Sequence, residues 1–104
     1  PAQIAGTSGS DVLDGTSNAD VIRGKGGNDT LDGAGGDDTV SGDGGNDVIR
    51  GGTGRDVLLG GAGNDRIFAR DGDSDTIACG RGRDTVQADR ADTITGECEV
   101  VRAQ

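Results

Sequence analysis

Aspartate recurs along this chain with a spacing of nine residues. The sequence contains 17 Asp and only two Glu, although an acidic surface kept for solubility would use both residues freely. The register aspartates are Asp11, Asp20, Asp29, Asp38, Asp47, Asp56 and Asp65 at intervals of nine, followed by Asp75, Asp84 and Asp92 at intervals of ten, nine and eight. Carboxylates that keep such a register indicate a shared chemical task.

The groups available for that task are hard oxygen ligands. The chain has no His and only two Cys, so the candidates are Asp carboxylates and the backbone carbonyls of glycine-rich segments. Many oxygen ligands suit calcium, whereas magnesium demands stricter octahedral geometry and zinc or copper prefers imidazole or thiolate. We therefore predict that the chain binds calcium.

The overall charge agrees with a cation as partner. A net charge of −9 and a pI near 4.2 attract cations and repel nucleic acid phosphates and anionic membranes. No apolar stretch approaches the roughly 20 residues of a membrane span. We expect neither nucleic acid binding nor a membrane span.

The segment that leads up to each register aspartate is rich in glycine. Residues 42–47, 51–56 and 60–65 show the unit most clearly, as GDGGND, GGTGRD and GGAGND. Glycine lets the backbone take positive φ and turn tightly, and Asn and Asp tolerate the left-handed region better than other residues do. We therefore predict a six-residue turn that ends at each register aspartate.

The three residues after each turn alternate in polarity and favour a strand. In segments such as 39–41 and 48–50 the middle residue is aliphatic, and its neighbours face the other side of the strand. The aliphatic positions are Leu13, Ile22, Leu31, Val40, Ile49, Leu58, Ile67, Ile77, Val86 and Ile94, with Ile4 in the same register ahead of them. Nothing repeats at 3.6 residues, so the pattern predicts an all-β chain.

One turn and one strand make nine residues, and two such units make a coil of 18. Odd and even units then lie on opposite sides, and strands on the same side stack in parallel about 4.7–4.9 Å apart. The aspartates form two columns, one with Asp29, Asp47 and Asp65 and the other with Asp20, Asp38 and Asp56. Stacked like charges repel each other, and a cation between successive turns converts this repulsion into attraction.

The G-G-x-G-x-D unit followed by an aliphatic residue resembles the RTX (hemolysin-type) calcium-binding nonapeptide repeat family. The resemblance covers nearly the whole chain. It implies a right-handed parallel β-roll, or β-solenoid, with two nonapeptide units in each coil. It also implies that calcium is bound between successive turns on the same side, by the Asp of both turns and by backbone carbonyls of the glycine-rich residues.

Carried over to this sequence, the resemblance implies about seven calcium ions. The most regular pairs are Asp29 with Asp47, Asp38 with Asp56 and Asp47 with Asp65. Less regular pairs are Asp11 with Asp29, Asp20 with Asp38, Asp56 with Asp75, and Asp65 with Asp84; the pair of Asp75 with Asp92 is the least regular. The expected turn ligands are Gly24, Gly26, Gly27, Gly33, Gly35, Gly36, Gly42, Gly44, Gly45, Gly51, Thr53, Gly54, Gly60, Ala62 and Gly63.

Departures from the repeat explain this ranking. Asn18 replaces a glycine in the second turn, residues 69–75 carry one extra residue, and residues 88–92 lack one. The acidic residues outside the register are expected to be solvated rather than ligands, namely Asp14, Asp32, Asp37, Asp43, Asp71, Asp73 and Asp89. Residues Asn28, Asn46 and Asn64 are expected to form turns.

The repeat stops near Cys98, which lies 19 residues after Cys79. A solenoid must cap its last apolar rung, and we expect Val100 and Val101 to cover it. A disulfide between Cys79 and Cys98 would fasten this cap; two free thiols are the alternative. The predicted organisation is one domain over residues 1–104, with repeats at about 4–95 and the cap at about 96–104.

The cysteines also bear on location. RTX proteins exported by the one-step type I route generally lack Cys, and a paired Cys in a small calcium-dependent fold points to an oxidising exterior. With nine Arg against one Lys, the chain is more similar to short secreted calcium-binding repeat proteins of high-GC Gram-positive bacteria. It begins at Pro1 rather than Met, so we expect a mature form or fragment, located outside the cell or on its surface.

The apolar content is too small to explain folding alone. Leu, Ile, Val and Phe number 19 in a chain of net charge −9, a composition typical of disorder. The regular spacing argues against disorder, and bound calcium can supply folding free energy when the sites exist only in the folded state. The leading hypothesis is a secreted structural or interaction module that folds on binding extracellular calcium.

Other functions remain open at this point. The chain could be the C-terminal repeat domain of a larger secreted protease or lipase, although it is not itself expected to be an enzyme, since it has no His, Tyr or Trp and no nucleophile motif. The outward strand face could instead bind ice or another surface. Val57, Leu59 and Phe68 could form an apolar patch for self-association or a partner.

Overall fold

The computed structural model describes residues 3–69, 74–88, 92–95 and 98–102, with the backbone alone for residues 99–102. Within these ranges the chain forms short strands joined by turns. The strands are β1 (Gln3–Ala5), β2 (Val12–Asp14), β3 (Val21–Arg23), β4 (Thr30–Asp32), β5 (Thr39–Ser41), β6 (Val48–Arg50), β7 (Val57–Leu59), β8 (Arg66–Phe68), β9 (Thr76–Ala78), β10 (Thr85–Ala88), β11 (Thr93–Thr95) and β12 (Glu99–Arg102). The three-residue strands predicted at 39–41 and 48–50 are confirmed.

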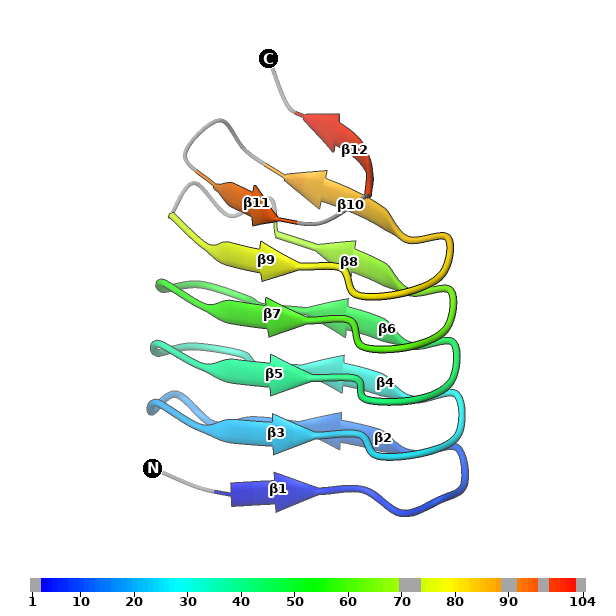
Figure 1. Cartoon of the computed structure of the whole chain (residues 1–104). Helices are drawn as coiled ribbons and strands as arrows, with labels where there is room; N and C mark the ends of the chain where they lie inside the picture. The colour runs from blue at the N-terminus through cyan, green and yellow to red at the C-terminus, as the bar shows by residue number, and fades with distance from the viewer. Residues whose placement is uncertain (1–2, 70–73, 89–91, 96–97, 103–104) are drawn as a thin grey trace.

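The strands form two parallel sheets of six strands each. One sheet has the order β1-β3-β5-β7-β9-β11, and the other has the order β12-β10-β8-β6-β4-β2. Each strand pairs with the next strand but one along the chain, as Thr39 with Val57 and Val48 with Arg66 show. Figure 1 shows the chain rising from the N-terminus to the C-terminus as a right-handed solenoid, with one strand of each sheet in every coil. The predicted parallel β-roll, with about 18 residues per coil, is confirmed.

The core lies between the two sheets and is narrow. The middle residue of each strand points inward, because side chains alternate along a strand. The aliphatic residues of the central coils are completely buried, namely Ile22, Leu31, Val40, Ile49, Leu58, Ile67, Ile77 and Val86. Ile4, Leu13 and Ile94, nearer the two ends, are only partly buried against this cluster. Each sheet therefore contributes a single column of aliphatic side chains to the core.

The outward side chains lie in straight rows because the strands are in register. The odd-numbered sheet aligns Val21, Thr39, Val57, Thr76 and Thr93 in one row and Arg23, Ser41, Leu59, Ala78 and Thr95 in the next. Val57 and Leu59 belong to β7, whereas Phe68 belongs to β8 of the opposite sheet. The predicted apolar patch of these three residues is therefore wrong. The Phe68 ring instead packs under the Arg50 guanidinium, 5.4 Å from the ring centroid.

The C-terminal end continues the even-numbered sheet. The backbone of β12 pairs in parallel with β10, with Val100 opposite Val86. The expected disulfide between Cys79 and Cys98 is present, with the two Cα atoms 5.9 Å apart, and Cys79 is fully buried. The expected covering role of the Val100 and Val101 side chains lies outside the described residues.

Candidate metal sites

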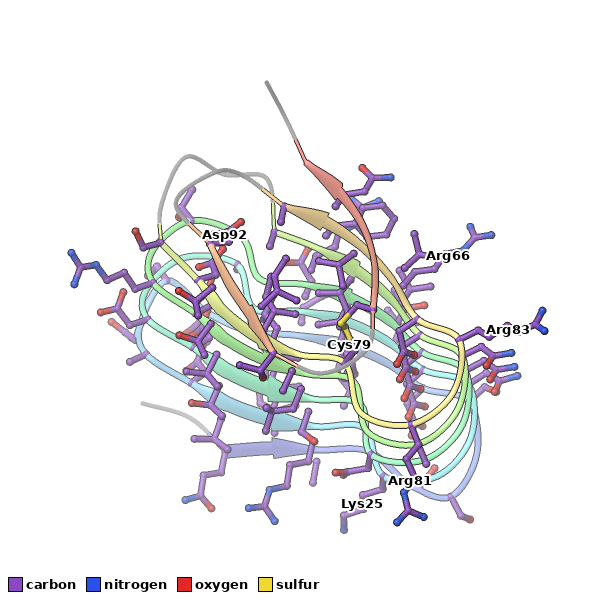
Figure 2. All side chains as sticks on the ribbon, turned by 45° about the horizontal axis from the view of Figure 1, so that its top comes forward. Lys25, Arg66, Cys79, Arg81, Arg83 and Asp92 are labelled. Atoms are coloured by element: carbon purple, nitrogen blue, oxygen red, sulfur yellow. A yellow bond between two sulfur atoms is a disulfide. The ribbon has the colours of Figure 1, made fainter. Side chains whose placement is uncertain are left out.

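The turns are stacked along two edges of the roll. Turns that follow odd-numbered strands form the first edge, and turns that follow even-numbered strands form the second edge. In Figure 2 the first edge carries Lys25, Arg81 and Arg83, whose charged ends point away from the coil, and the second edge carries Asp92. The aspartates thus form two columns, one on each edge.

Each regular turn has two residues with positive φ. The fourth residue before the register aspartate has φ of 61–79°, and the second residue before it has φ of 81–103°. The first group is Lys25, Ala34, Asp43, Gly52, Gly61 and Gly80, and the second is Gly27, Gly36, Gly45, Gly54, Gly63 and Gly82. Nine of the twelve are Gly and the others are Lys, Ala and Asp, so none is branched at Cβ, which agrees with the steric limits on the left-handed region.

The register carboxylates are buried in the stacked turns. All but the first of them expose 5 % of their surface or less, namely Asp20, Asp29, Asp38, Asp47, Asp56, Asp65, Asp75, Asp84 and Asp92. Asp11 is half-buried. In each column, Oδ1 of one aspartate accepts the backbone N–H of the aspartate one coil earlier. Asp29 donates to Asp47 at 2.8 Å, and Asp47 donates to Asp65 at 2.9 Å. These bonds align the carboxylates along both edges.

The second carboxylate oxygen has a different environment. Oδ2 of Asp29, Asp38, Asp47, Asp65 and Asp84 is buried and accepts no hydrogen bond from the residues that the structure describes. A buried anionic oxygen without a donor is costly, because it has lost its water without a replacement. These oxygens therefore require a positively charged partner when they are ionised.

At the glycine that opens each regular turn, a carbonyl oxygen of the next coil lies close to Oδ2 of the register aspartate. A Cβ placed on Gly33 would lie 2.7 Å from Oδ2 of Asp38 and 2.7 Å from the carbonyl oxygen of Gly51 in the next coil. Around Gly24, the corresponding distances are 2.6 Å to Oδ2 of Asp29 and 3.1 Å to the carbonyl oxygen of Gly42. Only glycine leaves room for a carboxylate oxygen and a carbonyl oxygen of successive turns to approach each other here.

The other predicted turn ligands lie farther along each turn. Cβ positions on Gly54 and Gly63 would collide with the carbonyl oxygens of Gly36 and Gly45 one coil earlier, so these glycines allow the turns to stack closely. Gly44 has open space around it, and the side chains of Thr53 and Ala62 are exposed. The remaining predicted turn ligands lie in the same stacked turns, namely Gly26, Gly27, Gly33, Gly35, Gly36, Gly42, Gly45, Gly51 and Gly60.

An ion in these turns would need backbone oxygens as well as carboxylates. In the part of the chain that the structure describes, no three Asp, Glu, His or Cys side chains converge on one point. Successive turns instead present carboxylate and glycine carbonyl oxygens. This set of hard oxygens fits calcium, which takes about six to eight oxygen ligands, carbonyls among them.

Burial also changes the acidity of the central aspartates. Desolvation raises the pKa of Asp47 to about 6 and the pKa of Asp65 to about 7. The N–H of the preceding aspartate lowers each pKa in part, while neighbouring carboxylates raise it, namely Asp29 and Asp43 for Asp47, and Asp47 and Asp84 for Asp65. Burial raises the pKa of Asp38 as well. Without a cation, Asp38, Asp47 and Asp65 therefore hold their protons to a higher pH than solvated aspartates do.

Polar residues beside the register also fasten the turns. Oδ1 of Asn28 accepts the N–H of Asn46, and Oδ1 of Asn46 accepts the N–H of Asn64, both at 2.8 Å. Asp37 accepts the N–H of Arg55 one coil later at 2.9 Å. The structural role of Asp37 was missed, although its separation of 18 from Arg55 matches the coil. The off-register Asp71, Asp73 and Asp89 lie outside the described residues.

The first two turns have a different hydrogen-bond pattern, which sequence reasoning also missed. The Thr7 N–H donates to Oδ2 of Asp11 at 2.6 Å, and the Thr16 N–H donates to Oδ2 of Asp20 at 2.6 Å. Each threonine hydroxyl also donates to the carboxylate of its turn. A signal was present in the sequence, because both turns begin with Gly-Thr-Ser.

The fold and its stacked acidic turns define a repeat protein of the parallel β-roll class. A family model described as the RTX calcium-binding nonapeptide repeat (4 copies) matches residues 5–40 and again residues 41–74. Because these ranges cover more than half of the 104 residues, the chain belongs to this family and is a calcium-binding repeat module. Comparison with curated proteins gave no match. Among the described residues, no helix is long and apolar enough to cross a membrane.

Proposed function

We propose that this chain is a secreted structural or interaction module that folds when it binds calcium outside the cell. The observation that carries the proposal is the column of buried Oδ2 atoms without donors in the described structure. The core beside them contains one column of aliphatic side chains from each sheet. Burying several unpaired carboxylates against so small a core disfavours folding, and a bound cation removes that cost.

The residues that would hold calcium are the register aspartates of successive turns on one edge. Asp47 provides Oδ2 within its own turn and lies between Asp29 and Asp65 in the first-edge column. The carbonyls of Gly42, Gly51 and Gly60 lie next to the first glycine of the preceding coil. Bound calcium supplies the positive charge that these oxygens need. About seven ions follow from the predicted pairs of aspartates.

A structural or binding role outside the cell agrees with the rest of the molecule. The Cys79–Cys98 disulfide is typical of proteins in oxidising compartments. A calcium-binding repeat of the β-roll class is typically structural, and its carboxylates are buried between turns rather than set in a substrate cleft. The aligned outward rows of the odd-numbered sheet are the surface through which we expect a partner or a second copy to bind.

A calcium titration tests this proposal directly. Far-UV circular dichroism in chelator at pH 7.5 should show little β-structure, and calcium should restore it cooperatively with heat release in calorimetry. Sodium chloride at matched ionic strength is the control, because screening alone leaves the Oδ2 atoms without ligands. A full β-signal in chelator that does not change on adding calcium would contradict the proposal.

A further inference from the structure

The first two turns satisfy their carboxylates with their own threonines. In the first turn, Oδ2 of Asp11 accepts the Thr7 N–H at 2.6 Å and the Thr7 hydroxyl at 3.2 Å. In the second turn, Oδ2 of Asp20 accepts the Thr16 N–H at 2.6 Å and the Thr16 hydroxyl at 2.9 Å. The equivalent Oδ2 atom remains buried without a donor in regular turns such as that of Asp29.

The equivalent N–H points elsewhere in the regular turns. The N–H of Lys25 donates to Asp43 at 3.1 Å, and the N–H of Ala34 donates to Asp32 at 2.9 Å. Neither bond involves the register aspartate of its own turn. The difference lies in the N–H of the fourth residue before the register aspartate. This N–H faces the carboxylate of its own turn at Asp11 and Asp20, but not at Asp29 and Asp38.

The side chain at this position explains the difference. Lys25, Ala34 and Asp43 have φ of 61–65° there, whereas Thr7 and Thr16 are not among the described residues with positive φ. Threonine is branched at Cβ, which makes the left-handed conformation costly. The threonine hydroxyl also accepts the N–H two residues later, from Gly9 and from Asn18, both at 3.1 Å, and so stabilises the alternative turn.

Hydrogen-bond donors now face the carboxylate where a cation would have to bind. The N–H and O–H groups present their positive ends to Oδ2, and a cation placed there would be repelled by them and would break these bonds. We propose that Thr7 and Thr16 take the place of an ion in the first two turns, so that the calcium array begins at Asp29 on the first edge and Asp38 on the second. This inference rests on the proposed calcium sites.

The consequence is a shorter array than the repeat itself. The pairs of Asp11 with Asp29 and of Asp20 with Asp38 then hold no ion, so the expected number of ions falls from about seven to about five. The first coil then stabilises its carboxylates with hydrogen bonds from neutral N–H and O–H donors and forms an end of the array that needs no calcium. The threonines are specificity-determining residues in this sense, because they select which aspartates of the register bind the ion.

A substitution that restores the regular turn tests the inference. Thr7→Gly converts residues 6–11 from GTSGSD to GGSGSD, which matches the repeat unit at every fixed position. Native mass spectrometry at saturating calcium should then count one more bound ion than in the unchanged chain. Ser8→Gly is the matched control, because it adds a glycine to the same turn, keeps Thr7 and should leave the ion count unchanged.

Asp11→Asn provides an independent test in a chain that keeps both threonines. It should leave the ion count unchanged in the original sequence and remove the additional ion from the Thr7→Gly variant. Loss of one ion on Asp11→Asn alone, or an unchanged count in a folded Thr7→Gly variant, would overturn the inference. These results differ from a failure of the proposed function, in which the unchanged chain would bind no calcium at all.

Discussion

Each register aspartate uses its polar groups in separate directions. The Asp47 N–H donates to Asp65, Oδ1 accepts from Asp29, and Oδ2 lies buried beside Gly42. The first two contacts link three consecutive coils by hydrogen bonds. The third leaves a buried anionic oxygen without a donor in the described structure, which a cation or a proton would stabilise. In the proposed sites, one side chain therefore serves both the stacking of the turns and the binding of calcium.

Substitution of Asp47 should therefore be more damaging than loss of an ordinary acidic residue. Asp47→Ala removes a ligand shared by two of the proposed first-edge sites, and we expect the calcium midpoint of folding to rise by at least about tenfold. Asp14→Ala is the control, because Asp14 is exposed on β2 and lies outside the register. Equal midpoints for the two variants in calcium titrations followed by circular dichroism would contradict the shared-ligand role.

The two glycines of one turn give a second comparison at the level of single residues. A Cβ on Gly42 would collide with Oδ2 of Asp47 and lie 2.9 Å from the Gly60 carbonyl oxygen, whereas nothing lies within 4 Å of a Cβ on Gly44. Gly42→Ala should lower the free energy of unfolding in calcium by roughly 1–3 kcal/mol or more. Gly44→Ala should change it by no more than about 0.5 kcal/mol. Guanidinium denaturation in calcium measures both, and similar losses for the two would argue against a cramped ligand position at Gly42.

At the scale of turns and strands, most of the structure was predictable because the constraints repeat. Every unit has an aliphatic residue two positions after its aspartate, and alternation along a strand places that residue inward. The conformation of individual turns was less predictable, since it depends on the sign of φ at one position. Lys25 and Ala34 adopt positive φ there, and Thr7 and Thr16 do not, so a change that preserves the spacing reverses the direction of a peptide N–H.

Because of the stacked turns, the stability of the ion-free folded chain should decrease as the pH rises. Burial raises the pKa of Asp47 to about 6 and of Asp65 to about 7, while both are near 3.9 when unfolded. Between these values the folded state binds more protons than the unfolded state, so its stability decreases as the pH rises from about 4 to about 7. In chelator, circular dichroism should show more β-structure at pH 5 than at pH 8.

In the presence of calcium the folded state should instead be more stable at pH 8 than at pH 5, because protons compete with the ion for the same oxygens. The calcium midpoint should therefore be higher at pH 5 than at pH 8. Asp47→Asn combined with Asp65→Asn removes two of the carboxyl groups whose pKa burial raises and should weaken the pH dependence of folding in chelator. A β-signal in chelator that grows from pH 5 to pH 8 would show that these carboxylates fold ionised without a cation.

On the scale of the whole molecule, the stabilising contacts are made mainly between neighbouring coils. Each strand contacts mainly the strands one coil before and one coil after it in its own sheet, and the core is one column of side chains from each sheet. In such a linear array, the free energy of unfolding is close to the sum of the intrinsic stabilities of the repeats and the energies of the interfaces between neighbouring repeats. The proposed ions between neighbouring turns would therefore act on every interface of the regular coils, and we expect their removal to unfold the array as a whole.

This expectation is best tested by the size of the molecule in solution. The folded chain has a Cα radius of gyration of 12.0 Å, whereas an unfolded chain of about 100 residues has a value of about 30 Å. Small-angle X-ray scattering should show the larger value in chelator and a value close to the folded one in millimolar calcium. Magnesium at the same concentration should not compact the chain, because it keeps its waters and does not accept a ligand set dominated by carbonyls and flexible carboxylates. Equal compaction by the two ions would mean that charge neutralisation, rather than calcium coordination in the turns, drives folding.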